Sequence, residues 1–596
     1  MLASILLQLT PLRANLAAER RDLRRAVGQQ LRAYRTGLSV LAEAGNSGRS
    51  SPSGRSSRPH PQTIPLRYQV WRLQYGQSTN QVLTSEEAIT DFFQRDGIEG
   101  RVLILGDPGM GKTHTLLALG DQLLRRTEAS GPVPVLVDLS AWDGENLDHW
   151  LVSYLWEMYR ICQPTAMVWL QSGQLTLLLD GFDHLPTPRQ RACAKEINTL
   201  LRSNPEQTAL LCCRRQVLET SGIDFSEFNS GLYIVPLAAQ QVKDYLLAQG
   251  CDALWPQVKA SKALQPLGRF PLYLSLLVAL APVLSADASA ITGKDALVQV
   301  YLRHHLDRAP NPATATERAT LRWLADHLGS RSRSLRLDAL GPSWLPEAQR
   351  LLYRLLVGLA LLGIFTVIGG NPGLGLAWGL AFSQLDLEAF PYTRLSLALA
   401  SWRSVGGLAL VCAVPALVLG LGVGSLGSLL LARFNLGLPA FGWGGLVGAV
   451  LGWGLGLGLG LWGGLPQGIQ SRQWPNQDIP MALRNGAVLF GLLALILALV
   501  LVLPAVVHGQ PPLTLLTVPR LRVVIAALIS AYLWFSFALQ QGVVRVILAR
   551  SPAHFPWAMV TWMQRCTQRR VLRQWGSDYG FVHETLRDAL AKDRSS

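Results

Sequence analysis

The sequence contains the segment Leu103-Ile104-Leu105-Gly106-Asp107-Pro108-Gly109-Met110-Gly111-Lys112-Thr113, in which an apolar run passes directly into a Gly-x4-Gly-Lys-Thr loop. Glycines in such a loop let backbone N–H groups close around phosphate oxygens, because no Cβ stands in the way. We expect a helix over residues 112–126, whose N-terminus directs its positive dipole end at the anion. The pattern therefore predicts a P-loop and an α/β nucleotide-binding core.

Each residue of this loop has an expected role. Lys112 reaches the β- and γ-phosphates as a point charge, and Thr113 offers its hydroxyl to Mg²⁺. A Gly-rich turn that matches by accident is the alternative, and the strand before the loop and the helix after it argue against that alternative. We assign nucleotide binding to the whole loop and the residue after it: Gly106, Asp107, Pro108, Gly109, Met110, Gly111, Lys112, Thr113 and His114.

A second apolar run, Leu177-Leu178-Leu179, ends in Asp180-Gly181-Phe182-Asp183-His184. An acidic residue at the end of a buried strand is typical of a Walker B segment, where it holds Mg²⁺ through water. We therefore assign Asp180 to the metal site together with Thr113, and we expect Asp183 to orient the attacking water. A plain strand and turn with a capping aspartate is the alternative, and a P-loop upstream favours the metal site.

Strand-like runs alternate with helix-like segments between residues 64 and 236. This alternation predicts a parallel sheet flanked by helices, and ligands bind at the carboxyl ends of such strands. We expect residues 237–319 to form a helical lid domain. The expected strands cover residues 102–105, 133–139, 175–179, 208–213 and 232–235.

The chain is basic, with a formal net charge of +15, and arginine is concentrated near its N-terminus. The run Glu19-Arg20-Arg21-Asp22-Leu23-Arg24-Arg25 lies in a helix expected over about residues 11–41, within a basic N-terminal segment 1–44. Residues 45–63 are rich in Ser, Gly, Pro and Arg, and we expect them to be disordered. A solvated helical face is the favoured interpretation of the arginines. Anionic lipid headgroups stay open as partners, and nucleic acid is less favoured.

Residues 354–550 are rich in Leu, Gly, Val and Ala and poor in charge, which predicts an α-helical transmembrane bundle. Flanking arginines place the nucleotide-binding part and both termini in the cytoplasm by the positive-inside rule. We expect about six passes, counting the first run as a hairpin, and membrane lipids as partners. Five apolar runs carry this expectation: Leu355–Phe382, Val405–Leu431, Leu436–Leu465, Gly486–Val507 and Val523–Leu548.

These residues resemble the NACHT-domain NTPases of the STAND class, which are signal-transducing switch ATPases, and in particular their bacterial type with membrane helices. The resemblance covers about residues 80–345 and includes Val135–Trp142, Leu211–Arg215 and Leu267–Leu274. It implies that Arg214 is the sensor arginine that contacts the γ-phosphate, a catalytic role beside Asp183. It also implies that Pro271 is the lid proline that packs against the base.

The C-terminal residues extend the resemblance. Residues 571–580 predict a strand, a turn and a strand, and residues 581–591 predict a helix. This pattern is similar to the end of the winged-helix domain of STAND proteins, which implies that His583 contacts the β-phosphate of bound ADP. Residues 320–353 and 551–596 would then be two halves of one domain, split by the membrane block. A tail helix with an ordinary surface histidine is the alternative.

One departure bears on hydrolysis, because the family usually has Glu where this chain has His184. Neutral histidine is not a carboxylate base, so we expect slow NTP hydrolysis. The expected function is a switch in the bacterial inner membrane that is off with ADP and on with ATP. GTP stays open as the nucleotide, Mg²⁺ is the expected metal, and activation could form a homo-oligomer. An NTP-driven transporter and a membrane-tethered nucleic-acid-binding regulator are the alternatives.

Overall fold

The computed structural model describes residues 16–39, 64–72, 77–95, 97–127, 131–220, 222–284, 291–307, 312–331, 334–338, 340–369, 475–477, 479–484, 487, 539–551 and 555–592. They belong to two compact units. The larger unit comprises Leu16–Leu337, Ile469–Pro475 and Ser551–Ser596, and the smaller unit comprises the rest of the chain. Most of the five apolar runs and the expected linker 45–63 lie outside the described residues.

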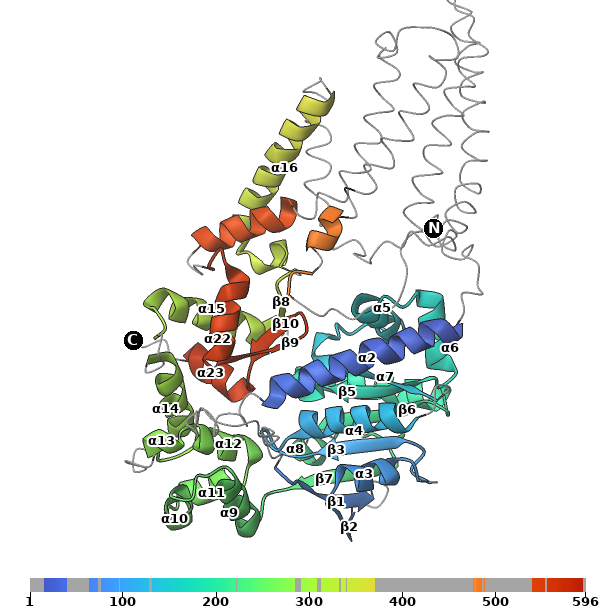
Figure 1. Cartoon of the computed structure of the whole chain (residues 1–596). Coiled ribbons are helices and arrows are strands. Elements are labelled where there is room, and N and C mark those ends of the chain that lie inside the picture. Colours follow the sequence, from blue (N-terminus) through green and yellow to red (C-terminus); the bar gives the residue numbers. More distant parts are fainter. Residues whose placement is uncertain are drawn as a thin grey trace, which may run out of the picture. The chain divides into compact units, whose positions relative to one another are not determined.

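A mostly parallel sheet of seven strands forms the centre of the larger unit (Figure 1). Its order is β2-β1-β7-β3-β6-β5-β4, in which β7, β3, β6, β5 and β4 run parallel. The expected strands are all present, and the nearly continuous burial of their Val, Leu and Ile side chains is typical of a sheet covered on both faces. These strands are β3 (Arg101–Leu105), β4 (Val133–Asp138), β5 (Leu175–Asp180), β6 (Thr208–Cys213) and β7 (Ser230–Val235).

Two strands were missed from the sequence. Strand β1 (Arg67–Arg72) pairs antiparallel with β7, and β2 (Gln77–Leu83) pairs antiparallel with β1 at the edge of the sheet. In β1 only Tyr68 and Val70 are buried, so the strand alternates rather than forming an apolar run. That alternation was the signal available in the sequence, and it covers only a few residues.

Helices cover the faces of the sheet (Figure 1). Helix α4 (Lys112–Arg126) starts at the P-loop and has the bounds expected from the sequence. Single 3₁₀ turns follow two strands: η3 (Leu139–Ala141) after β4 and η4 (Phe182–His184) after β5. The other helices of this region are α3 (Glu86–Phe93), α5 (Leu147–Tyr159), α6 (Gln163–Gln171), α7 (Thr187–Ser203) and α8 (Arg215–Thr220).

The arginine-rich helix α2 (Leu16–Ser39) packs against α4 and β4. Leu23, Val27 and Leu31 are fully buried on this side. Arg24 donates to the carbonyl oxygens of Leu124 (2.8 Å) and Thr127 at the end of α4 (2.7 Å), where cations stabilise the helix dipole. The expectation of a solvated face is therefore wrong for this side of α2.

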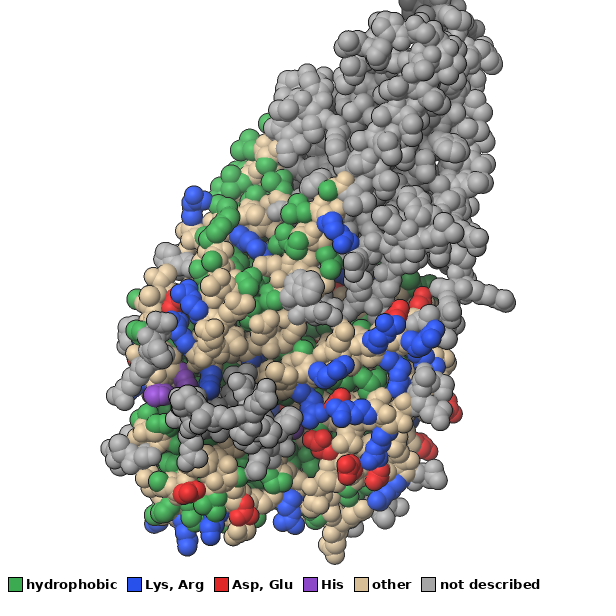
Figure 2. Space-filling model, in the orientation of Figure 1, with side chains coloured by type: hydrophobic (Ala, Val, Ile, Leu, Met, Phe, Trp, Pro, Cys, Tyr) green, Lys and Arg blue, Asp and Glu red, His purple; other side chains and the backbone are tan. Residues whose placement is uncertain are grey.

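Basic side chains also gather on the outer surface of α2 and α4 (Figure 2). Arg21 and Arg25 are exposed on the outer side of α2. Some arginines of this run therefore bind α4 and others face solvent, because residues one position apart on a helix point in different directions.

Helices follow β7, as expected for residues 237–319, although the boundaries of the proposed domains stay predictions. The first of these helices begins directly after the sheet, and α12 begins at Pro271 beside the P-loop. The helices are α9 (Ala239–Ala248), α10 (Leu254–Ala260), α11 (Leu264–Gly268), α12 (Pro271–Ala279), α13 (Ala281–Leu284), α14 (Lys294–Asp307) and α15 (Ala315–Arg331).

A second, three-stranded sheet joins residues from both sides of the long insertion. Strand β8 (Leu335–Arg336) pairs antiparallel with β10 (Asp578–Phe581), which pairs with β9 (Leu572–Trp575). Helix α22 (Met559–Gln568) packs on β9, and α23 (Glu584–Lys592) packs on α14 and α15. The chain therefore leaves this sheet after β8 and returns to it at β9, while the winged-helix identity of this region stays a prediction.

The smaller unit contains η5 (Pro342–Trp344), α16 (Glu347–Gly369) and helical residues 479–484 and 539–550. Gln541 donates hydrogen bonds to the carbonyl oxygens of Asp338 (2.9 Å) and Leu340 (2.8 Å). Within the described ranges, no helix combines the length and apolar character needed to cross a membrane.

A candidate nucleotide-binding site

The P-loop follows β3 and depends on two glycines with positive φ. Gly109 has φ of 82° and Gly111 has φ of 96°, a region that glycine adopts without steric cost. A Cβ on Gly109 would lie 3.0 Å from the Cβ of Leu272. The N–H of Leu272 donates to the carbonyl oxygen of Gly109 at 3.1 Å, so the start of α12 contacts the loop directly.

Lys112 and Thr113 begin α4 and face the ends of β5 and β3. The Nζ atom of Lys112 donates to the carbonyl oxygen of Gly106 at 2.9 Å and lies 3.4 Å from Oδ2 of Asp183. The hydroxyl of Thr113 donates to Oδ2 of Asp180 at 2.9 Å. A hydroxyl and a carboxylate at this distance are the oxygen ligands that Mg²⁺ takes in P-loop sites.

Asp183 joins the ends of β5 and β6. Its Oδ1 accepts from the backbone N–H of Arg214 at 2.8 Å, and its Oδ2 lies 3.4 Å from Nε of Arg214. Gly181, with φ of 83°, makes the turn that brings Asp183 back over the sheet. Asp183 is thus held between Lys112 and Arg214, two cations that would face a phosphate.

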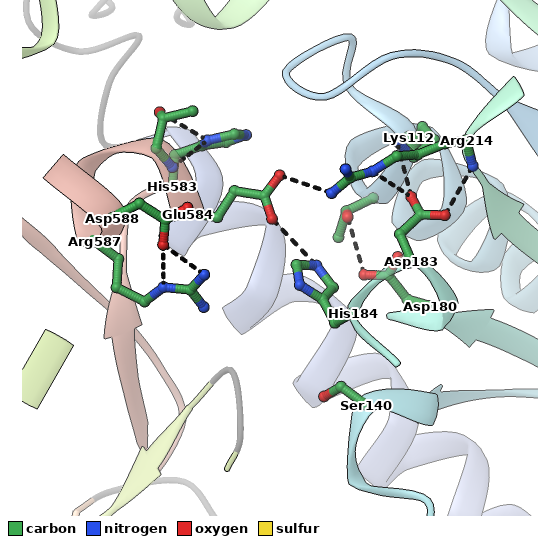
Figure 3. A network of polar contacts seen from close by, with 12 residues as sticks. Lys112, Ser140, Asp180, Asp183, His184, Arg214, His583, Glu584, Arg587 and Asp588 are labelled. Atoms are coloured by element: carbon green, nitrogen blue, oxygen red, sulfur yellow. Dashed lines mark hydrogen bonds and ion pairs between the residues drawn. The ribbon is translucent and has the colours of Figure 1, made fainter. Parts of the chain in front are cut away.

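Helix α23 and the residue that precedes it bring two further side chains to this place, those of Glu584 and His583 (Figure 3). Nδ1 of His583 accepts from the backbone N–H of Thr585 at 3.2 Å, so the neutral ring carries its proton on Nε2. Glu584 places Oε1 3.5 Å from Arg214 and Oε2 3.5 Å from Nε2 of His184. Residues far apart in the chain therefore meet at the ends of β5 and β6.

These side chains surround one cavity of about 790 Å³, a size in the usual range for small-molecule sites. The cavity is lined by most of the residues assigned from the sequence: Asp107, Pro108, Gly109, Gly111, Lys112, Thr113, His114, Asp180, Asp183, Arg214, Pro271 and His583. Gly106 and Met110 do not line it, and the side chain of Met110 is 1% exposed. The side chain of Met110 therefore packs into the core, and only its backbone can contact a ligand of the loop.

His114 occupies a special environment beside the P-loop. Burial lowers the pKa of its imidazole, Arg35 lowers it further, and Glu86 acts in the opposite direction. The ring is therefore neutral near pH 7. Tyr68 of β1 shares a hydrogen bond of 3.0 Å with the hydroxyl of Thr115, which fixes the first turn of α4 from the other side.

Several cavity residues were missed from the sequence. Arg32 and Arg35 reach the cavity from α2, and Glu584 and Arg587 reach it from α23. For α2 the signal was the burial pattern of Leu23, Val27 and Leu31, which sets the inward side of the helix. Glu584 follows His583 directly, and nothing else in the sequence marks it.

Comparison with known families matches residues 100–250 to the NACHT domain. The matched segment runs from the residue before β3 to the residues after α9 and contains both phosphate-site motifs. A comparison with curated proteins gave no match. The fold and this match together indicate a NACHT-type P-loop NTPase core that binds a nucleotide, typically with a divalent metal.

Proposed function

We propose that this protein is a nucleotide-dependent signalling switch of the STAND type, coupled to membrane-spanning helices. The observation that carries the proposal is the contribution of α23 to the cavity of the P-loop. Arg214 and Glu584 are 370 positions apart in the chain, and they form an ion pair beside the phosphate-binding residues. A ligand in this cavity therefore acts on contacts between the NTPase core and the segment that follows the insertion.

The closed arrangement suits a nucleoside diphosphate. Under this proposal the P-loop amides and Lys112 hold its phosphates, and Nε2–H of His583 donates to the β-phosphate. Thr113 and Asp180 hold Mg²⁺, which neutralises phosphate charge when bound. Pro271 begins α12 at the cavity wall, where an apolar ring packs against the base. ATP and GTP remain the candidate triphosphates.

Exchange for a triphosphate would release α23, because a γ-phosphate competes for the cations that now hold acidic side chains. Asp183 is placed to orient a water molecule, and Arg214 is placed to stabilise charge on the phosphoryl group. His184 provides no carboxylate, so we propose slow hydrolysis. Released protomers would assemble into a homo-oligomer.

The course of the chain supports coupling to a membrane. The insertion leaves after β8 and returns before β9, so both of its ends lie at one small sheet. An insertion of this kind crosses a bilayer an even number of times, which agrees with about six passes. In α16, Leu351, Leu355 and Leu359 are between 56% and 64% exposed and share one side of the helix.

We propose that the protein lies in the bacterial inner membrane, with the NTPase core and both termini in the cytoplasm and with lipids as partners. The nucleic-acid alternative is weakened, because Arg24 binds backbone carbonyls of α4 and Arg35 binds Asp121 at 2.6 Å. These side chains face protein groups rather than a polyanion.

The test is the nucleotide that full-length, detergent-purified protein releases on denaturation. We expect ADP from the wild type and a clear loss of it from His583→Ala. His149→Ala is the matched control, because His149 is exposed on α5 and does not line the cavity. Equal nucleotide content in wild type and His583→Ala would contradict the closing role of α23. A wild type that binds no nucleotide would contradict the whole proposal.

A further inference from the structure

Glu584 occupies a position between two residues of the NTPase core (Figure 3). Its Oε1 lies 3.5 Å from a terminal guanidinium nitrogen of Arg214, and its Oε2 lies 3.5 Å from Nε2 of His184. The side chain of Glu584 is 22% exposed and that of His184 is 18% exposed, so water screens these contacts only in part. The carboxylate therefore interacts with two residues of the NTPase core that line the cavity.

Arg214 is shared between two acids. Its backbone N–H and its Nε face Asp183, and a terminal nitrogen faces Glu584. Under the proposed function, this guanidinium also faces the γ-phosphate of a triphosphate. A γ-phosphate would have to draw Arg214 away from Glu584 and would bring negative charge close to that carboxylate. A diphosphate has no third phosphate, so it neither displaces Arg214 from Glu584 nor repels the Glu584 carboxylate.

A histidine at position 184 is compatible with a glutamate at position 584. A carboxylate at that position would face Glu584 at about the distance of the present contact, and two such carboxylates repel each other. His184 can instead donate to Glu584 through Nε2. The histidine in the Walker B segment and the glutamate on α23 are thus compatible, whereas two acids would not be.

We infer that Glu584 sets the preference of the closed site for nucleoside diphosphates over triphosphates. Its carboxylate interacts with Arg214 and His184. It thereby competes with the γ-phosphate of a triphosphate for Arg214. Glu584 acts through Arg214 and is therefore a positioning residue. This inference rests on the proposed function, since it requires that the cavity binds a nucleotide.

The experiment measures dissociation constants of full-length protein in detergent with Mg²⁺ for ADP and for a non-hydrolysable ATP analogue. Glu584→Gln keeps the size of the side chain and removes its charge. We expect the analogue to bind about tenfold more tightly to this variant, with ADP affinity changed by less than about threefold, which is in the range of typical coupling between sites. The ratio of the two constants is the readout, since a merely structural defect weakens both ligands.

Two further variants sharpen the result. Asp295→Asn removes the same charge from α14, which packs on α23, but Asp295 is exposed and does not line the cavity, so the ratio should stay at the wild-type value. His184→Glu should shift the ratio in the same direction as Glu584→Gln, because it repels Glu584 from its place.

A wild type that binds both ligands, with a ratio unchanged within about twofold in Glu584→Gln, would overturn the inference and leave the nucleotide switch standing. A ratio that shifts equally in Asp295→Asn would overturn it as well, because general electrostatics would then explain the effect. Failure of the wild type to bind either ligand would refute the proposed function and this inference with it.

Discussion

At the scale of single residues, Lys112 has the most direct link to ligand binding. Its ammonium group is directed toward the loop by the carbonyl of Gly106 and toward the sheet by Asp183. We expect Lys112→Ala to weaken nucleotide binding by at least tenfold, because the point charge on the phosphates is lost. Titration with a fluorescent nucleotide measures this loss. Lys195→Ala, on the exposed side of α7, is the control. Unchanged affinity in Lys112→Ala would place the ligand elsewhere.

A second residue-scale prediction concerns acid stability. Burial on α14 lowers the pKa of His305 to about 4, and His304 and Arg570 act in the same direction. The folded protein thus binds the proton more weakly than the unfolded chain, whose histidine titrates near 6.5. Stability from this group is fully present above about pH 6.5 and is lost as the pH falls toward 4.

At pH 5 the loss amounts to roughly 2 kcal/mol relative to pH 8. We expect the apparent melting temperature of the wild type to fall over this interval, and that of His305→Gln to fall less. Melting curves recorded by intrinsic fluorescence at pH 8, 6 and 5 test this. Parallel pH profiles for the two proteins would show that His305 is not the group responsible.

At the scale of secondary-structure elements, α2 is the helix that connects distant parts of the larger unit. It packs on α4, and near its end the ring of Tyr34 packs against that of Trp575 of β9, with ring centroids 5.3 Å apart and ring planes tilted by 41°. A Cβ on Gly37 would lie 2.7 Å from the carbonyl oxygen of Gln574. Gly37 is therefore needed for the close approach of α2 to β9.

We expect Gly37→Ala to lower the free energy of unfolding by about 1–3 kcal/mol, because overpacking forces the backbones apart. Helix propensity alone would raise stability by up to about 1 kcal/mol, so the sign distinguishes the two effects. Gly293→Ala is the control, since nothing lies within 4 Å of a Cβ there. Chemical denaturation compares the variants, and a stabilised Gly37→Ala would contradict the contact between α2 and β9.

At the scale of the whole molecule, the second sheet decides how the two ends of the insertion meet. Arg336 of β8 pairs with Asp578 of β10, and antiparallel partners have Cα atoms close enough for a disulfide. We expect Arg336→Cys with Asp578→Cys to form a disulfide under mild oxidation, detected as a linked peptide by mass spectrometry.

The control for this experiment is Arg336→Cys with Arg573→Cys. Arg573 lies on β9, which is separated from β8 by β10, and it pairs with Gly580 rather than with Asp578. The Cα atoms of Arg336 and Arg573 are therefore more than about 10 Å apart and beyond disulfide reach. Equal cross-linking of both pairs would indicate that the three strands do not keep the order described here.

The NTPase core could be predicted from local patterns in the sequence. The five parallel strands, helix α4 and the positions of Lys112, Thr113, Asp180 and Asp183 follow from local patterns, because apolar runs specify buried parallel strands and a glycine-rich loop specifies a phosphate site. The two strands and the helix around His583 could also be predicted, because their pattern is local in the sequence. Strands β1 and β2 were not, because their alternating burial is a weak signal.

Which distant residues share the cavity became known only from the folded chain. Local patterns carry no information about the partner of a charged side chain, so the pairing of Glu584 with Arg214 and His184 could not be foreseen. The ion pair of Arg35 with the buried carboxylate of Asp121 could not be predicted either. An arginine on a helix can face solvent or a buried acid, and its local sequence does not distinguish the two. These contacts exist because the chain returns to its second sheet after the insertion and thereby brings α23 to the end of β6.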